Sequence, residues 1–375
     1  MRVLHAYKVF RPDVDGGVPA VITTVVGGSA PEVSSRILVA RGRAGLGRTY
    51  GDNGTSVRAV ASFGNCLGMP IAPGFPAALA AEARKADVVA LHLPFPLNDI
   101  GALGIAGHIP IVVHWHADVI GRRMVARALE PLFHGTLRRA ARIIVADSAI
   151  AENSNLLGAY RGKCEVVPFG IDTDDWGTLD PEQLHRAERL RERYPRLVVA
   201  LGRLVPYKGF DVLVRASAQL DCHLVVIGTG KQQKYLEGIA ADLGAKTKVS
   251  FTGYLSHGDV KVHLHAARVF AFPSITKAET FGIAQLEAMA TGLPVVNTSI
   301  PTAVPRIARD GIEALTVPPH DVAALSAAIS RLLNDEGLAG RLGAAGRERA
   351  RDVFDQRQFL TRLNRIYREV HEANC

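Results

Sequence analysis

The chain has 375 residues, of which 48% are hydrophobic and 21% are charged; this composition is ordinary for an α/β protein, and the length excludes a single typical core. No apolar run reaches the ~18 residues that a membrane-spanning helix needs. The first residues lack the apolar core of a signal peptide, and Cys66, Cys164, Cys222 and Cys375 show no metal-binding or redox spacing. We therefore expect reduced thiols and a cytoplasmic location.

Part of the net charge of +8 lies in one basic stretch of the first half. Six arginines are interleaved there with the apolar residues Met124, Val125, Leu129, Leu132, Phe133 and Leu137; they are Arg122, Arg123, Arg127, Arg138, Arg139 and Arg142. The pattern predicts a basic amphipathic helix, which either contacts an anionic membrane surface or packs its apolar face on a sheet. Nucleic-acid binding is not expected, because the sequence carries no RNA- or DNA-binding signature.

Short apolar runs alternate with helical patterns along the whole chain. We expect strands at residues 3–7, 35–39, 56–60, 88–91, 111–115, 143–146 and 165–167, and again at 196–200, 223–227, 249–251, 269–272, 295–297 and 314–317. This rhythm predicts two doubly wound parallel α/β domains. They would comprise residues 1–172 and 195–353, joined by a linker at 173–194, with a helix at 354–375 that packs back across the domain junction.

Two features of the first half lie directly after predicted strands. Gly16 and Gly17 end the loop after the first strand and open a helix, so backbone there can approach a phosphate, although the third glycine of a dinucleotide fingerprint is missing. His114 and His116 flank the end of a later strand. Their spacing suggests a metal, but no third ligand is obvious, so we expect His114 to be a core histidine and His116 to be a polar contact at the strand tip.

The second half places cations and glycines at the carboxyl ends of strands, where open α/β sheets bind ligands. Arg203 and Lys208 bracket a proline turn after the strand at 196–200 and can clamp a diphosphate; the alternative is two solvated loop cations. Gly228 follows the next strand in a glycine turn that faces the same edge. Tyr254 and Leu255 follow a third strand and could border a nucleobase.

The most informative segment spans residues 277–292 and contains two carboxylates, Glu279 and Glu287, eight positions apart. We expect Glu279 in a loop after a strand and a helix at residues 281–291, with Glu287 about two turns into it and Gly292 ending it. The amides of residues 281–283 would then offer an anion site at the helix N-terminus. The alternative is one solvated glutamate and one ordinary helix-face glutamate.

These motifs together resemble those of the retaining glycosyltransferases of family 4. The resemblance covers nearly the whole chain and depends on Gly16-Gly17, His116, Gly202-Arg203, Lys208-Gly209, Glu279-x-Phe281-Gly282 with Glu287, and Gly292-x-Pro294-Val295. It implies the GT-B fold, in which two Rossmann-like domains face each other across a cleft. Within the family, residues 1–5 and 281–290 are most similar to bacterial O-antigen rhamnosyl- and mannosyltransferases.

The resemblance also implies roles for single residues. Glu287 would hold the ribose of a nucleotide-sugar donor, and Glu279 and His116 would contact the transferred sugar. The diphosphate would be neutralised by Arg203 and Lys208, without a metal or other cofactor. The donor-binding set implied is completed by Gly16, Gly17, Gly228, Tyr254, Leu255, Thr280, Phe281, Gly282 and Ile283.

The expected function is therefore transfer of a mannose- or D-rhamnose-type hexose from a nucleotide sugar, with a GDP-linked donor favoured, to a saccharide acceptor. A polyprenyl-diphosphate-linked acceptor at the inner membrane face would suit the basic first half and a role in lipopolysaccharide assembly. Two alternatives stay open at this point. One is a sugar-nucleotide epimerase of the same fold, and the other is a non-catalytic basic protein that binds a surface.

Overall fold

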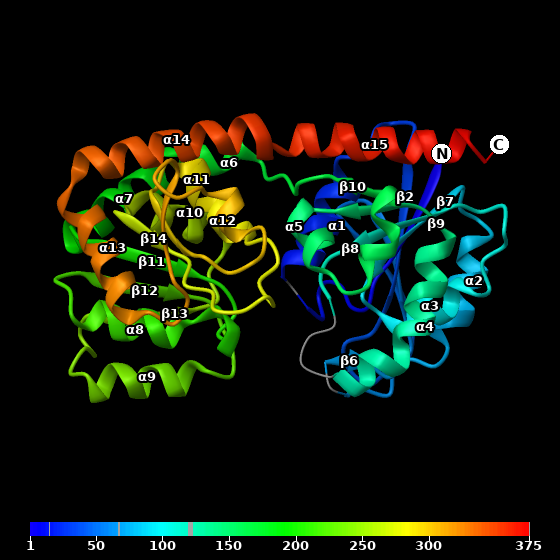
Figure 1. Ribbon diagram of the computed structural model, residues 1–375, viewed down its shortest axis with the longest axis horizontal. Helices are drawn as coiled ribbons and strands as arrows, with labels where there is room; N and C mark the ends of the chain where they lie inside the picture. The colour runs from blue at the N-terminus through cyan, green and yellow to red at the C-terminus, as the bar shows by residue number, and fades with distance from the viewer. Residues whose placement is uncertain (15, 67, 119–122, 375) are drawn as a thin grey trace. The chain divides into compact units, whose positions relative to one another are not determined.

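The computed structural model describes residues 1–14, 16–66, 68–118 and 123–374 and divides into two compact units (Figure 1). The first unit comprises Met1–Gly170 and Gln356–Cys375, and the second comprises Ile171–Asp355. Each unit has its own sheet with helices on both faces; the sheet is mainly parallel in the first unit and fully parallel in the second. This confirms the predicted α/β class with two Rossmann-like folds.

The first unit is built on an eight-stranded sheet in the order β10-β9-β8-β7-β1-β2-β4-β3. Its elements are β1 (Arg2–Ala6), α1 (Gly17–Gly27), β2 (Ser34–Ala40), β3 (Arg48–Asp52), β4 (Thr55–Val60), β5 (Asn65–Cys66), β6 (Met69–Pro70), α2 (Phe75–Ala83), β7 (Val88–Leu93), α3 (Pro96–Ala102), β8 (Ile111–Trp115), α4 (Arg123–Arg139), β9 (Ala140–Val145), α5 (Ser148–Asn153), the 3-10 helix η1 (Leu157–Lys163), β10 (Cys164–Val166) and α15 (Gln356–Glu372).

All seven strands expected in this unit are present. The strand β3, which pairs antiparallel with β4, and the short β5–β6 hairpin were not expected. Helices α2, α3 and α4 pack in sequence against one another, while α15 contacts β7 and β9. Strand β1 lies between β2 and β7, so the winding direction of the sheet reverses beside β1.

The second unit is built on a six-stranded parallel sheet in the order β13-β12-β11-β14-β15-β16. Its elements are α6 (Thr173–Gly177), α7 (Pro181–Arg193), β11 (Leu197–Leu201), the 3-10 helix η2 (Pro206–Lys208), α8 (Phe210–Ala218), β12 (His223–Ile227), α9 (Gln233–Asp242), β13 (Val249–Gly253), α10 (His257–Ala266), β14 (Val269–Ala271), α11 (Ile283–Thr291), β15 (Val295–Thr298), α12 (Val304–Ile307), β16 (Ala314–Val317), α13 (Val322–Asn334) and α14 (Glu336–Phe354).

The winding of this second sheet reverses between β11 and β14, the pair of strands whose carboxyl ends carry the main predicted motifs. Helices α8 and α9 lie on one side of the strands and α10 and α11 on the other (Figure 1). The central strands are fully buried; Val198 and Val269 are each 0% exposed. The sheet therefore forms a rigid platform beneath the loops that follow β11 and β14.

The boundaries differ from the prediction at the expected linker. Residues 173–194 form α6 and α7, which belong to the second unit. Asp180 and Gln183 form a capping box that starts α7, with Pro181 in its first turn. Helix α15 begins at Gln356 and belongs to the first unit, where Tyr367 bonds to His114 on β8.

Candidate active site

Lys208 and Glu279 form an ion pair at the carboxyl edge of the second sheet. Lys208 follows β11 at the end of η2, and Glu279 lies in the long loop after β14. Both side chains are largely covered, with 12% and 11% exposed. The hydroxyl of Ser274 also donates to Glu279, at 3.2 Å, and the Lys208 ammonium lies 4.8 Å from the ring centroid of Phe272. A largely covered lysine and a buried glutamate thus share one site at the point where the sheet reverses.

Backbone geometry brings the two loops of this site together. Gly209 has φ 67°, and a Cβ there would lie 2.1 Å from the carbonyl oxygen of Pro273, so the turn after Lys208 approaches the loop after β14 as only glycine allows. The carbonyl of Tyr207 accepts a bond from the amide of Ile275 at 2.9 Å. These contacts fix the position of Lys208 relative to the glutamate loop.

Helix α11 begins at Ile283, two residues later than predicted, because Gly282 adopts a left-handed conformation with φ 93°. A Cβ on Gly282 would lie 2.9 Å from the Phe272 ring. Phe281 precedes this turn and is buried. Glu287 is consequently about one turn into the helix, where the prediction had placed it at two.

Glu287 shares the electrostatic environment of the ion pair. Its side chain is half-buried on α11. Burial raises the pKa of this carboxyl to about 7, while the positive charge of Lys208 acts in the opposite direction. Glu287 therefore titrates near neutral pH, which is unusual for a glutamate.

A buried amide network supports the same loop, and the sequence motifs do not predict it. Gln285 donates to the carbonyl oxygens of Phe281, at 3.3 Å, and Val304, at 3.1 Å. Asn297 on β15 donates to the side-chain oxygen of Gln285, at 3.3 Å, and receives a bond from Thr316 at 2.7 Å. The signal in the sequence is a polar amide residue within each of two otherwise apolar segments, Gln285 and Asn297. Both side chains are fully buried, and buried polar groups are nearly always hydrogen-bonded.

The remaining predicted residues of this unit lie at the same edge of the sheet but are less enclosed. Arg203 follows β11, is exposed and donates to the hydroxyl of Tyr207 at 3.0 Å. Gly228 follows β12 and pairs with Gly253 at the end of β13. Tyr254 is 75% exposed and Leu255 is half-buried.

In the first unit, Gly16 caps α1 and Gly17 begins it, at the carboxyl end of β1, as the sequence predicts. His114 bonds through Nε2 to the hydroxyl of Tyr367 at 2.8 Å, which confirms it as a satisfied core histidine. His116 lies just after β8 and is 8% exposed. Burial, helped by the charge of Lys8, lowers the pKa of His116 to about 3.

His116 does not stand alone. His5 and His92, from β1 and β7, lie beside it in the interior of the unit, and both are 0% exposed. Among the residues that the structure describes, no group of three or more His, Cys, Asp or Glu side chains is arranged to hold a metal ion. The cluster is joined by hydrogen bonds and ring stacking between imidazoles.

The basic stretch of the first unit divides between several environments. Arg122 lies outside the described residues, as do the side chains of Arg123 and Val125. Arg139 donates to backbone carbonyls after α3, and Arg142 lies on β9 beside Glu165. The apolar residues Phe133 and Leu137 are fully buried, so this part of α4 packs its apolar face inward. No helix in the described part of the chain is long and apolar enough to cross a bilayer.

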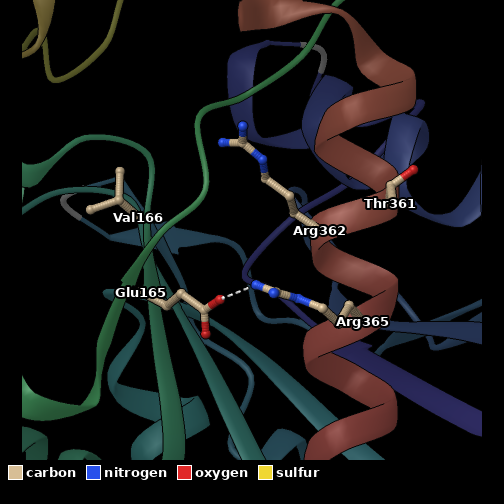
Figure 2. A pocket seen from close by; sticks show the side chains of 5 residues that line it. All are labelled: Glu165, Val166, Thr361, Arg362 and Arg365. Atoms are coloured by element: carbon tan, nitrogen blue, oxygen red, sulfur yellow. Dashed lines mark hydrogen bonds and ion pairs between the residues drawn. The ribbon is translucent and has the colours of Figure 1, made fainter.

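A separate pocket lies in the first unit between β10 and α15 (Figure 2). It is lined by Glu165, Val166, Thr361, Arg362 and Arg365, and Arg365 pairs with Glu165 at 3.0 Å. None of the predicted site residues lines it. We assign it no role.

The fold and this edge of the second sheet define a glycosyltransferase of the GT-B class. The structure of sucrose-phosphate synthase from Thermosynechococcus elongatus superposes with a TM-score of 0.83 over 99% of both chains, at 20% identity. A family model described as Glycosyltransferase Family 4 matches residues 16–175, and one described as Glycosyl transferases group 1 matches residues 182–349. The chain belongs to glycosyltransferase family 4 and is an enzyme.

Three curated relatives illustrate the likeness. The D-rhamnosyltransferase WbpZ of Pseudomonas aeruginosa is 29% identical over 94% of this chain and 92% of its own. The O-antigen chain mannosyltransferase C of Escherichia coli is 26% identical over 100% of both chains. The GDP-mannose-dependent alpha-(1-6)-phosphatidylinositol monomannoside mannosyltransferase of Mycolicibacterium smegmatis is 34% identical over 74% of this chain and 75% of its own. These matches do not favour an epimerase or a non-catalytic binding protein.

Proposed function

We propose that the chain transfers a hexose of the mannose or D-rhamnose type from a GDP-sugar to a saccharide acceptor, with retention of the anomeric configuration and without a metal. The acceptor is a lipid-linked saccharide of the polyprenyl-diphosphate kind, used in lipopolysaccharide assembly at the inner face of the plasma membrane. The observation that carries the proposal is the largely covered Lys208–Glu279 pair at the reversal point of the second sheet.

The leaving group of such a reaction is a nucleoside diphosphate, whose negative charge grows as the bond to the sugar breaks. Lys208 and the exposed Arg203 follow β11 and can neutralise that charge. The N-terminus of α11, with Gly282 and Ile283, adds backbone dipoles directed at an anion. Fixed cations and amides therefore supply the stabilisation that a metal provides in other transferases.

The carboxylates have separate roles in this proposal. Glu287 accepts hydrogen bonds from the ribose hydroxyls, and its ionised form does so better than its protonated form. Glu279, held by Lys208 and Ser274, contacts the transferred sugar. Binding of the diphosphate draws Lys208 toward the phosphates and frees an oxygen of Glu279 for a sugar hydroxyl.

In the retaining step, the acceptor hydroxyl attacks the anomeric carbon on the face from which the diphosphate leaves. One carbon–oxygen bond forms to the acceptor and one breaks to the diphosphate. The hydroxyl proton passes to an oxygen of the departing diphosphate, so the step needs no further base. His116 contacts the sugar being transferred.

The donor assignment is supported by the printed names of the relatives, which include a GDP-mannose-dependent mannosyltransferase and a D-rhamnosyltransferase. It is tested by measuring turnover of GDP-mannose, GDP-D-rhamnose and UDP-hexoses on a lipid-linked saccharide, with and without EDTA. We expect turnover of a GDP-sugar that survives EDTA and gives a product with the donor's anomeric configuration. A UDP-hexose turned over far faster than both GDP-sugars would refute the donor, and loss with EDTA that a divalent ion restores would refute the metal-free mechanism.

The proposal includes a peripheral contact between α4 and an anionic membrane surface. Arg127, Arg138 and Met124 remain exposed on α4, while its apolar residues Phe133 and Leu137 are used inside the unit. The contact would thus be electrostatic. Binding to vesicles that contain anionic lipid should fall when Arg127 and Arg138 are both replaced by Glu and should disappear at high salt. Binding that is equally strong to neutral vesicles would contradict it.

A further inference from the structure

The histidine cluster of the first unit contains more than the catalytic function requires. His5 on β1, His92 on β7 and His114 on β8 lie on three neighbouring strands, and His116 follows β8. The strand register places His92 opposite His114 and His5 opposite Ala90. Four imidazoles therefore meet where this sheet reverses its winding.

Three of the rings are hydrogen-bonded in series. Nδ1 of His5 lies 3.2 Å from Nε2 of His92, and Nδ1 of His92 lies 2.9 Å from Nε2 of His116. Among the described residues, the two outer nitrogens, Nε2 of His5 and Nδ1 of His116, are buried and have no partner. His114 stacks on His92 at 4.5 Å between centroids but bonds to Tyr367 instead. The series is thus His5–His92–His116, open at both ends.

The rings in this series are neutral at pH 7. Burial lowers the pKa of His5 to about 4 and that of His116 to about 3, and it lowers the pKa of His92 as well. A neutral imidazole carries one N–H and one bare nitrogen. Three rings therefore supply three protons, and the two bonds between rings use two of them.

Because two of the three ring protons lie in the bonds between rings, the tautomer of one ring determines the tautomers of the other two. If Nδ1 of His92 donates to His116, then Nε2 of His92 is bare and must accept from Nδ1 of His5. Nε2 of His116 accepts, so the proton of His116 is on Nδ1, and all three rings are Nδ1–H tautomers. Reversing the direction makes all three Nε2–H tautomers. A mixed set breaks a hydrogen bond.

We propose that His92, and His5 acting through it, are positioning residues that hold His116 as the Nδ1–H tautomer, so that His116 donates a hydrogen bond to an oxygen of the transferred sugar. This inference rests on the proposed function for the sugar contact itself. Without a ligand, either direction leaves one buried N–H unpaired, at Nδ1 of His116 in the proposed direction and at Nε2 of His5 in the alternative. Only the N–H of His116 gains an acceptor when the sugar binds, so with sugar bound the alternative alone keeps an unpaired N–H in the interior. A buried N–H without an acceptor is a rarer defect than a buried bare acceptor.

The other end of the series favours the same direction. His116 retains a small exposure of 8% at the end of β8, and its ring stacks against Phe169 at 5.8 Å. A sugar oxygen that accepts from Nδ1 completes the series, leaving one bare lone pair on His5. Because Nδ1 of His116 is buried, the sugar reaches it only if the ring or its neighbours move.

The direct test is the histidine tautomer in solution. Protein labelled with 15N-histidine gives long-range proton–nitrogen spectra that show which ring nitrogen carries the proton, and replacing each histidine by glutamine assigns the signals. Near pH 7 and with a saturating nucleotide sugar bound, we expect His5, His92 and His116 to be Nδ1–H tautomers. A different tautomer on any of the three, or a charged ring, overturns the proposal.

A pair of variants tests the effect on turnover. His92→Phe keeps a buried aromatic ring but removes both bonds, so the proton of His116 should redistribute between its nitrogens. The orienting partners of metal-bound imidazoles change activity by roughly 10–100-fold, and we expect a loss of kcat of that order, with the Kd of GDP unchanged. His114→Phe is the matched control, because it alters an equally buried ring outside the series. It should leave the tautomer of His116 unchanged.

An unchanged tautomer of His116 in His92→Phe, or equal losses of kcat in the two variants, would contradict the positioning role. If a variant does not fold, the spectrum of the unaltered protein still decides the question. A common tautomer together with no turnover of any nucleotide sugar would refute the proposed function and leave the hydrogen-bonded series intact. Turnover of a nucleotide sugar together with mixed tautomers would support the proposed function and refute the hydrogen-bonded series.

Discussion

Lys208→Met should destabilise the second unit by about 3 kcal/mol, because it leaves Glu279 as a covered carboxylate without its cation. Removing one partner of a buried ion pair costs about 3–5 kcal/mol, whereas an exposed pair contributes about 0–1 kcal/mol. The side chains of this pair are 12% and 11% exposed, so the cost should lie nearer that of a buried pair than that of an exposed pair. The bond from Ser274 at 3.2 Å stays in place and keeps the loss at the lower end of that range.

The assay is urea unfolding followed by tryptophan fluorescence. The chain has two tryptophans, Trp115 in the first unit and Trp176 in the second, so a Trp115→Phe background reports on the second unit. With a slope of about 1–3 kcal/mol per molar urea, the loss should lower the midpoint by about 1 M or more.

The double variant Lys208→Met/Glu279→Gln separates stability from catalysis. It removes the uncompensated charge and should regain most of the lost stability, since replacing both members of a buried pair is close to neutral. Turnover should stay lost, because the diphosphate still lacks its cation. A single-variant loss below about 1 kcal/mol, or a double variant no more stable than the single one, would refute the reasoning about this pair.

Three further predictions concern the loop and helix beside the pair. Because the pKa of Glu287 is about 7 in the folded chain, GDP affinity should rise as the pH rises through that value. The free energy of unfolding should fall between pH 4.5 and 7, since the unfolded chain ionises this group at lower pH than the folded chain does. Glu287→Gln should remove both dependences, and Glu287→Ala should weaken GDP binding in calorimetry by roughly ten- to a hundredfold at pH 8. Gly282→Ala should cost about 1–3 kcal/mol in urea unfolding, because its φ is 93° and the new Cβ meets Phe272; a neutral effect would contradict that geometry. Gln285→Leu should cost about 1–3 kcal/mol by removing the buried bonds that Gln285 donates to the carbonyls of Phe281 and Val304, and it should raise KM for the donor; unaltered KM would show that the network does not support the donor loop.

Local patterns predicted the strands well, because buried parallel strands are short and continuously apolar. The sequence does not predict strand β3, because residues Arg48–Asp52 are mostly polar and their side chains are exposed or half-buried at the sheet edge. Helix α7 was hidden in the supposed linker although its start signals, Asp180 and Gln183, are visible in the sequence. The later start of α11 could not be foreseen, since it depends on the Phe272 ring against Gly282.

The sequence also identified single site residues better than their partners. Lys208 and Glu279 were both singled out, but their pairing depends on how two loops approach one another across the sheet edge. His116 was singled out without His5 and His92, because these come from strands 87 residues apart in the chain that meet only through the sheet order. Long-range register of this kind leaves no local trace.

The hydrogen bond between His114 and Tyr367 joins residues that are 253 positions apart, and both belong to the first unit. During synthesis the ribosome makes residues 1–170 before the second unit, whereas α15, which packs on β7 and β9, follows the second unit. The second unit can complete its fold on the nascent chain while the first still exposes the apolar surface that α15 will cover. A chain truncated before Tyr367 would therefore carry an unfinished first unit, and we expect such products to depend on chaperones or to be degraded.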